Sequence, residues 1–198
     1  LGDYVVTEAG FGADLGAEKF MDIKCGYAGL APNAIVLVAT IRALRHHGGA
    51  KKEEYNSPSI DRVIKGFLNL EKHIENCKKF GITPVVAINY FPNDSTEEIE
   101  YVQTQCEKMG AKAVVSYGFA QGGDGTTKLA EAVLDVIENG NNKFKPLYDW
   151  NMKVEDKINR IATEIYGADG VEYSSKARTQ LKMINDLGYD KLPICMAK

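Results

Sequence analysis

Runs of apolar residues along the chain follow two different periods, which predicts strands alternating with helices. Three continuous runs rich in β-branched residues are typical of strands buried on both faces of a parallel sheet. They cover residues 34–41 (AIVLVATI), 84–88 (PVVAI) and 113–116 (AVVS). Weaker runs predict two further short strands at residues 4–6 and 192–196.

Between these runs, apolar residues recur every three or four positions and predict amphipathic helices. Ser57 before Pro58 predicts an N-cap followed by proline at the first helical position. Ser95 and Glu98 form a capping box, which predicts the start of the next helix. The predicted apolar stripes cover residues 60–77, 99–109, 129–137, 158–165 and 177–184.

This alternation predicts a doubly wound α/β fold with a mostly parallel sheet and right-handed crossovers. We expect residues 1–140 to form the α/β domain that carries the candidate site. Residues 141–198 are predicted to be mostly helical and are the candidate for a second subdomain, with the polar loop 139–145 as hinge.

Two loops that follow predicted strands each carry a phenylalanine where ligands bind in such sheets, beyond the carboxyl ends of the strands. Loop 89–94 (NYFPND) holds Phe91 stiffly, because a proline restricts the residue before it. Loop 117–125 (YGFAQGGDG) carries Phe119. Neighbouring strand tips lie about 5 Å apart, so the two rings could sandwich a planar ligand, each stack contributing on the order of 1 kcal/mol. The alternative is that both rings cap the core.

A third loop, residues 7–16 (TEAGFGADLG), is rich in glycine. Gly10, Gly12 and Gly16 would let backbone amides approach an anion closely at the start of a helix. The alternative is a tight turn with close helix packing. A dinucleotide-dependent oxidoreductase would also need an acidic residue about 20 positions further on, after the next strand. The chain offers Asp22, which lies in a predicted helix.

The order of strand, Asn89, helix, strand and Ser116 resembles the base-reading part of P-loop GTPases. It predicts a sheet of the P-loop nucleoside triphosphatase type. Guanine recognition would need Lys after the Asn and Asp two residues later, but Tyr90 and Pro92 occupy those positions. The GxxxxGK[ST] phosphate loop is absent from the 198 residues. Together with a first residue other than Met, this predicts an internal piece of a longer polypeptide.

Composition narrows the class of protein. The chain has 24 Lys and Arg against 27 Asp and Glu, a formal net charge of −3, which lacks the broad basic footprint of a nucleic-acid binder. Its apolar runs are shorter than the roughly 18 residues of a transmembrane helix, and a signal peptide is absent. We therefore expect a cytoplasmic protein with neither nucleic acid nor membrane as partner.

Candidate metal ligands are sparse and leave the metal unknown. His46 and His47 are adjacent and point apart, which makes them a poor chelating pair. Glu8 and Asp14 are candidates for holding Mg²⁺ through water, although Asp14 could instead cap a helix. The four cysteines lie far apart without CxxC spacing, which disfavours disulfides and structural zinc: Cys25, Cys77, Cys106 and Cys195.

Three large side chains near the predicted loops have open roles. Arg42 and Arg45 follow the strand at residues 34–41 and face either a phosphate or a salt bridge and solvent. Trp150 precedes a predicted helix and is interpreted as packing rather than as a ligand contact.

Four stretches together resemble the formate–tetrahydrofolate ligase family, over essentially the whole chain. The resemblance implies an ATP-dependent ligase that joins formate to tetrahydrofolate, giving 10-formyltetrahydrofolate, ADP and phosphate through formyl phosphate. It also implies MgATP and tetrahydrofolate as substrates, a monovalent cation and a homotetramer. The stretches are residues 7–49 (TEAGFGADLGAEKFMDIKCGYAGLAPNAIVLVATIRALRHHGG), 85–95 (VVAINYFPNDS), 119–125 (FAQGGDG) and 161–174 (IATEIYGADGVEYS).

By this resemblance, the pterin of the folate stacks between Phe91 and Phe119, where the second position is often tryptophan in the family. The family's phosphate loop and its basic residue for formyl phosphate would lie upstream of residue 1, so this segment holds no assigned catalytic residue and is expected to be inactive alone. The alternative is a non-catalytic interaction or assembly module. The other implied cleft residues are Pro92 and Val115 for folate, and Gly10, Phe11, Gly12 and Asn89 for the shared nucleotide and folate cleft.

Overall fold

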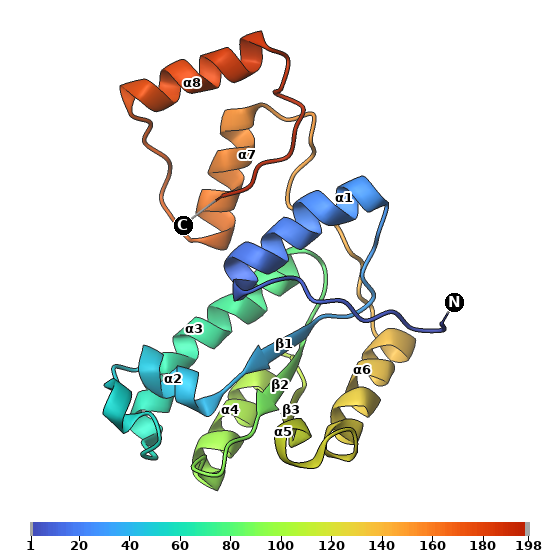
Figure 1. Cartoon of the computed structure of the whole chain (residues 1–198), viewed down its shortest axis with the longest axis vertical. Coiled ribbons are helices and arrows are strands. Elements are labelled where there is room, and N and C mark those ends of the chain that lie inside the picture. The colour runs from blue at the N-terminus through green and yellow to red at the C-terminus, as the bar shows by residue number, and fades with distance from the viewer. Residues whose placement is uncertain (1, 197–198) are drawn as a thin grey trace. The chain divides into compact units, whose positions relative to one another are not determined.

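The computed structural model describes residues 2–196, which form two compact units. The sheet unit is Pro32–Phe144, and the helical unit combines Leu1–Ala31 with Lys145–Lys198. Figure 1 shows the strands confined to the first and α7 and α8 to the second. This division differs from the predicted boundary at residue 140, because the N-terminal segment belongs with the C-terminal helices.

The sheet unit is built on three parallel strands in the order β1-β2-β3. Leu37 pairs with Val86, and Ile88 pairs with Val115, so the strand ends are aligned. The α/β class predicted from the apolar runs is confirmed, and the P-loop nucleoside triphosphatase type stays a prediction. The strands are β1 (Val36–Ala39), β2 (Val85–Asn89) and β3 (Ala113–Ser116).

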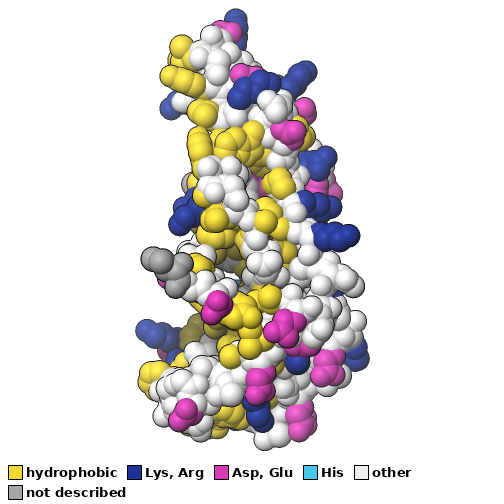
Figure 2. Space-filling model, turned by 90° about the vertical axis from the view of Figure 1, so that its right-hand side faces the viewer, with side chains coloured by type: hydrophobic (Ala, Val, Ile, Leu, Met, Phe, Trp, Pro, Cys, Tyr) yellow, Lys and Arg dark blue, Asp and Glu magenta, His cyan; other side chains and the backbone are white. Residues whose placement is uncertain are grey.

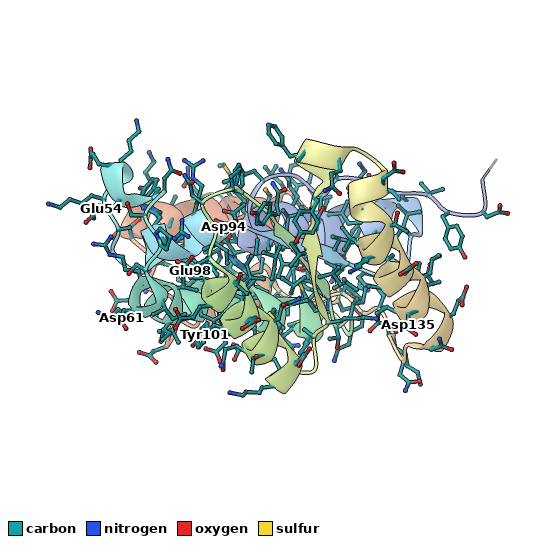
Figure 3. The ribbon with its side chains drawn as sticks, turned by 90° about the horizontal axis from the view of Figure 1, so that it is seen from below. Glu54, Asp61, Asp94, Glu98, Tyr101 and Asp135 are labelled. Atoms are coloured by element: carbon teal, nitrogen blue, oxygen red, sulfur yellow. The ribbon has the colours of Figure 1, made fainter. Side chains whose placement is uncertain are left out.

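Helices connect the strands and cover the sheet on both faces (Figures 1 and 3). The crossover helices α3 and α4 pack together on one face, and α6 packs against β2 and β3 on the other. The first four of the five residues of β2 are therefore buried. The helices are α2 (Ile41–His47), α3 (Ile60–Lys79), α4 (Thr96–Lys108), α5 (Gly118–Gln121) and α6 (Thr127–Asn139), with 3₁₀ turns at Lys52–Glu54 and Asp124–Thr126.

The outer strand β1 is less buried than its sequence predicts. Val36 and Val38 are 42% and 65% exposed, whereas Leu37 is buried. The prediction that this run is buried on both faces is wrong, because α6 covers β2 and β3 and leaves one face of β1 open. Figure 2 shows exposed hydrophobic side chains among charged ones on the face in view.

Helix starts in the sheet unit follow hydrogen bonding more closely than sequence signals. The capping box of α4 is confirmed, since the Ser95 hydroxyl accepts from the Glu98 amide and the Glu98 carboxylate accepts from the Ser95 amide. The predicted start of α3 at Ser57 and Pro58 is wrong. Its N-cap is Ser59, whose amide donates to the Glu98 carboxylate at 2.8 Å and so finds a partner on another helix.

The predicted hinge is fixed to the sheet unit over most of its length. The side-chain oxygen of Asn142 accepts from the Thr83 amide at 3.0 Å, and the Lys143 amide donates to the Gly81 carbonyl at 3.0 Å. Gly81 has a φ of 78°, and a Cβ there would lie 2.0 Å from the Lys143 carbonyl oxygen. The segment after α6 therefore runs back along the amino ends of the strands before it leaves the unit.

The helical unit is held together by contacts between its two sequence segments. The Asp22 carboxylate accepts from the Leu147 amide at 2.6 Å, and the Trp150 indole donates to the Asp22 carbonyl at 2.9 Å. The Trp150 ring also lies 4.8 Å from the Tyr27 ring, so this side chain packs within the unit. Its helices are α1 (Cys25–Ala28), α7 (Val154–Arg160) and α8 (Ser175–Asp186), with π-helical turns at Gly12–Ala17, Phe20–Lys24 and Ile161–Ile165.

The two weakly predicted strands are absent from residues 2–196. Residues 4–6 are extended but pair with none of the three strands, and Val5 and Val6 are 87% and 96% exposed. Residues 192–196 are irregular, and Cys195 is exposed rather than buried in a strand. Both predictions are wrong, because a short apolar run needs a neighbouring strand to complete its hydrogen bonds.

A buried pair of acids lies within the helical unit. Glu18 and Asp22 are four residues apart on consecutive helical turns, and both are at most 1% exposed. Burial, and after it the neighbouring Asp22, raise the pKa of Glu18 to about 9, although Lys19 opposes this. Burial also raises the pKa of Asp22, although the hydrogen bond from the Leu147 amide opposes this.

Glu18→Gln should stabilise the protein in alkali. A carboxyl whose pKa is raised by folding binds its proton more tightly when folded, so stability falls as the pH rises from the ordinary 4.5 towards about 9. Removing that titration should raise stability at pH 8 by on the order of 2 kcal/mol and flatten the decline. Urea unfolding at several pH values measures this, with the exposed Glu172→Gln as control. An unchanged slope in Glu18→Gln would contradict the assignment.

Helices α2 and α3 approach each other through glycine. A Cβ on Gly66 would lie 1.9 Å from the Leu44 carbonyl oxygen, and one on Gly48 would lie 1.9 Å from the Arg62 carbonyl oxygen. Only a residue without a side chain lets the two backbones come this close. This contact fixes α2, which follows β1, against α3.

Gly66→Ala should destabilise the protein by about 2 kcal/mol or more, although alanine favours helix. The added methyl group forces α2 and α3 apart against rigid backbone. Denaturant unfolding measures the change. Gly123→Ala is the matched control, because a Cβ there meets open space and its φ is −59°, and it should shift stability by less than about 0.5 kcal/mol. Equal midpoints for both variants would show that the helix contact is not tight.

Candidate functional site

The carboxyl ends of the three strands form one edge of the sheet, where the predicted ligand loops meet. Asn89 pairs with Ser116, and the Tyr90 amide donates to the Ser116 carbonyl at 3.1 Å, so the loops after β2 and β3 start side by side. On the β1 side, the Thr40 side chain accepts from the Ala43 amide and caps α2. The strands β2 and β3 are therefore neighbours, which is the condition on which the paired-ring interpretation depends.

Phe91 is half-buried and lies under a guanidinium group. The central carbon of Arg42 is 5.4 Å from the centre of the Phe91 ring, within the range of a cation–π contact. The Phe91 amide donates to the Asp94 carboxylate at 2.9 Å, which closes a tight turn. Arg42 therefore makes an aromatic contact, and the phosphate role left open for it stays a prediction.

Phe119 lies on the short helix α5 and is 86% exposed. It therefore does not cap the core, and that alternative is wrong for this ring. Its loop closes on itself, because the Tyr117 amide donates to the Gly125 carbonyl at 3.0 Å. A Cβ on Gly125 would lie 2.6 Å from the Tyr117 carbonyl oxygen, so glycine is required at this closure. The closed loop presents the Phe119 ring to solvent.

The two loops meet through a different pair of rings from the predicted one. Tyr90 and Tyr117 have ring centres 4.9 Å apart, tilted by 52°. Each is the first residue after its strand, so the register that pairs Asn89 with Ser116 also brings them together. The sequence shows a tyrosine near the start of each loop, but only the strand register brings the two together as a pair.

Arg45 is fully buried and joins the turn after α2, the loop that carries Phe91 and the start of α4. Its guanidinium donates to both carboxylate oxygens of Glu98, at 2.8 and 2.5 Å. It also donates to the carbonyls of Tyr55 at 2.8 Å and Asn93 at 2.9 Å, and Asp94 lies 3.7 Å away. Of the roles left open for Arg45, the structure shows the salt bridge.

The acids around Arg45 respond to burial in opposite ways. Burial alone would raise the pKa of Glu98, but hydrogen bonds from Arg45, Ser59 and Ser95 outweigh it and lower the pKa to about 2. Burial raises the pKa of Asp94, although the Phe91 amide and Arg45 oppose this. Figure 3 shows Asp94 and Glu98 beside one another near the start of α4. Glu98 is therefore the charged partner of Arg45.

With this geometry in view, the comparison with known families is decisive. The family model of formate–tetrahydrofolate ligase matches residues 1–198, the whole chain. The chain belongs to this family. Membership gives the general activity, ligation of formate to tetrahydrofolate, and implies ATP and tetrahydrofolate as substrates. The resemblance of the four stretches is thereby confirmed.

The other residues that the resemblance implies for folate and nucleotide binding are divided between the two units. In the sheet unit, Pro92 is exposed in the Phe91 loop, while Asn89 and Val115 are half-buried at the ends of neighbouring strands. In the helical unit, Phe11 is 99% exposed between two glycines.

The glycine loop of the helical unit is a tight turn. Gly10 and Gly12 have φ values of 87° and 79°. A Cβ on Gly16 would lie 2.6 Å from the Gly10 carbonyl, so the close-packing alternative describes this loop. Close packing and anion binding are compatible here, because Gly10 and Phe11 are both exposed.

The ligase's other predicted ligands are spread out. Glu8 is exposed, and the Asp14 carbonyl accepts from the Tyr166 hydroxyl at 3.2 Å. Within residues 2–196, no group of three or more His, Cys, Asp or Glu side chains could hold a metal ion. The same residues contain no helix long and apolar enough to cross a membrane.

Glu98→Gln should lower the stability of this ligase most at neutral pH. It should also make that stability less dependent on pH between pH 3 and 7. Folding lowers the pKa of Glu98, so its contribution to stability is complete above its ordinary pKa of 4.5 and is lost as the pH falls towards 2. The amide also leaves Arg45 buried without a counter-charge, which costs about 3 kcal/mol at pH 7. Urea unfolding between pH 3 and 7 tests this. The exposed Glu97→Gln on the same helix turn is the control. The same pH dependence of stability in both variants would contradict the prediction.

Proposed function

We propose that this chain carries the folate-binding half of the active site of a ligase that makes 10-formyltetrahydrofolate, ADP and phosphate through formyl phosphate. The observation that carries the proposal is the pair of phenylalanines on adjoining loops at the carboxyl edge of β2 and β3. Phe119 is 86% exposed, and Phe91 is held in place from behind. An exposed aromatic ring on a closed, glycine-rich loop is explained by a ligand that covers it.

The pterin of tetrahydrofolate suits this pair of rings. It is a flat bicyclic ring system, and stacking against an aromatic side chain contributes on the order of 1 kcal/mol beyond the area buried. Pro92 and Val115 would line the pocket between the rings, and Asn89 would offer an amide at the end of β2. Gly10, Phe11 and Gly12 of the helical unit would contribute to nucleotide binding.

The reaction needs positive charge more than a covalent nucleophile. Formyl phosphate forms when a formate oxygen attacks the γ-phosphorus of MgATP, and phosphoryl transfer of this kind is promoted by cations placed around the phosphate. The folate nitrogen then attacks the formyl carbon, and phosphate leaves. Arg42 supplies a cation beside Phe91, at the edge where the pterin would lie. The proposal assigns no catalytic residue in residues 1–198.

The phosphate-binding part of the site is proposed to lie in residues outside this chain, because its sequence contains no GxxxxGK[ST] loop. The chain alone is then expected to bind folate weakly and not to turn over. The proposal extends, from the family resemblance, to activation by a monovalent cation, a homotetramer and a cytoplasmic location.

A second candidate is a non-catalytic assembly module that keeps the fold. The open face of β1, with Val36 and Val38 exposed, favours it. A phosphate loop encoded upstream of residue 1 would support the ligase, and an upstream sequence without one would support the module.

Phe91→Ala and Phe119→Ala should each weaken tetrahydrofolate binding by about five- to tenfold in the natural-length ligase, through loss of one stacking contact. Phe119→Trp should bind more tightly, because the larger ring covers more of the pterin. Isothermal titration calorimetry measures the three affinities. Tyr189→Ala, an exposed aromatic of the helical unit, is the control. Wild-type affinity in both alanine variants would rule out the site.

A further inference from the structure

Two arginines on one face of α2 hold the loop that carries Phe91. Arg42 and Arg45 are three residues apart on this helix, which places them on the same side. Arg42 contacts the Phe91 ring from α2, and Arg45 binds the backbone of the same loop at the Asn93 carbonyl. The position of the ring relative to β1 is therefore set by α2.

The Arg45 contacts are arranged so that the loop cannot shift alone. The guanidinium is also held by both oxygens of Glu98, which is in the first turn of α4. That carboxylate accepts in addition from the Ser59 and Ser95 amides, at 2.8 and 3.0 Å. The end of the Phe91 loop at Asn93 and the first turn of α4 are thus tied to α2 and to the start of α3 through one ion pair.

Burial makes this pair rigid. Arg45 and Glu98 are both 0% exposed, so water cannot replace any of these hydrogen bonds. Removing one charge leaves the other uncompensated in the interior, whereas removing both can leave stability little changed. An ion pair of this kind is costly to bury, and its geometry fixes the chain around it.

We propose that Arg45 and Glu98 are positioning residues for folate binding, which fix the Phe91 ring in the orientation that stacks on the pterin. This rests on the proposed function of Phe91 as a pterin contact. The pair does not touch the substrate. The affinity for tetrahydrofolate depends on the pair, whereas the affinities for formate and ATP do not.

The double variant Arg45→Met with Glu98→Gln separates positioning from stability. It removes both charges, and the single side-chain oxygen of glutamine can still accept from one of the Ser59 and Ser95 amides. In the natural-length ligase we expect its melting temperature to be closer to that of the wild type than that of Arg45→Met alone, with the KM for tetrahydrofolate raised about tenfold or more. The KM for ATP should not change. Arg45→Met alone should be much less stable.

The partly exposed ion pair between Arg62 and Glu54, at 2.8 Å, provides the matched control. It joins neighbouring elements of the same unit but has no contact with the Phe91 loop among those described. Arg62→Met with Glu54→Gln should leave every KM unchanged. A wild-type KM for tetrahydrofolate in the folded Arg45 and Glu98 double variant would overturn the proposal.

Phe91→Ala, measured in parallel, separates a failure of the proposed function of Phe91 from a failure of the positioning role of Arg45 and Glu98. If Phe91→Ala itself leaves the KM for tetrahydrofolate unchanged, the proposed function of the ring fails, and the positioning role fails with it. If Phe91→Ala raises this KM, the triple variant gives the decisive comparison. Adding the Arg45 and Glu98 changes to Phe91→Ala should raise the KM no further, because their effect passes through that ring. A further tenfold increase would show that they act elsewhere.

Discussion

The sheet unit depends on one buried ion pair, between Arg45 and Glu98. Both side chains are fully buried, and together they satisfy polar groups from α2, the turn after it, the start of α3 and the loop between β2 and α4. Removing two charges from water is costly, and only such a complete set of partners offsets that cost. The elements around the pair must therefore keep their relative positions, including the loop that carries Phe91.

A second constraint also acts on α2. Gly66 and Gly48 let the backbones of α2 and α3 touch, so the helix that supplies both arginines is seated against the longest helix of the unit. Close packing against α3 and the ion pair together leave α2 little freedom. In the proposed folate site, this would hold the Phe91 ring in place, while the ring of Phe119 is exposed.

Local signals in the sequence were enough for much of this fold. The strand at residues 113–116 and the capping box at Ser95 have the bounds that the sequence predicts, because each depends on residues close together in the chain. The start of α3 was missed, since Ser59 is capped by a carboxylate 39 residues away. The strands predicted at residues 4–6 and 192–196 failed because an apolar run does not reveal whether a partner strand lies beside it.

Part of the candidate site could likewise be predicted from local sequence, and part could not. Phe91 and Phe119 could be identified from the loops that hold them, but the contact of Arg42 with Phe91 and the pairing of Tyr90 with Tyr117 depend on strand register. The Arg45 and Glu98 pair spans 53 residues of sequence, and nothing in either local pattern points to the other.

The exposed valines of β1 have a consequence for how the sheet can grow. As the outer strand of the order β1-β2-β3, β1 hydrogen-bonds to β2 on one side only. Its other backbone edge, together with Val36 and Val38, is a template onto which an additional parallel strand could be laid without disturbing the three already present. The carboxyl edge that bears the rings would then lengthen by one strand position, on the side of β1.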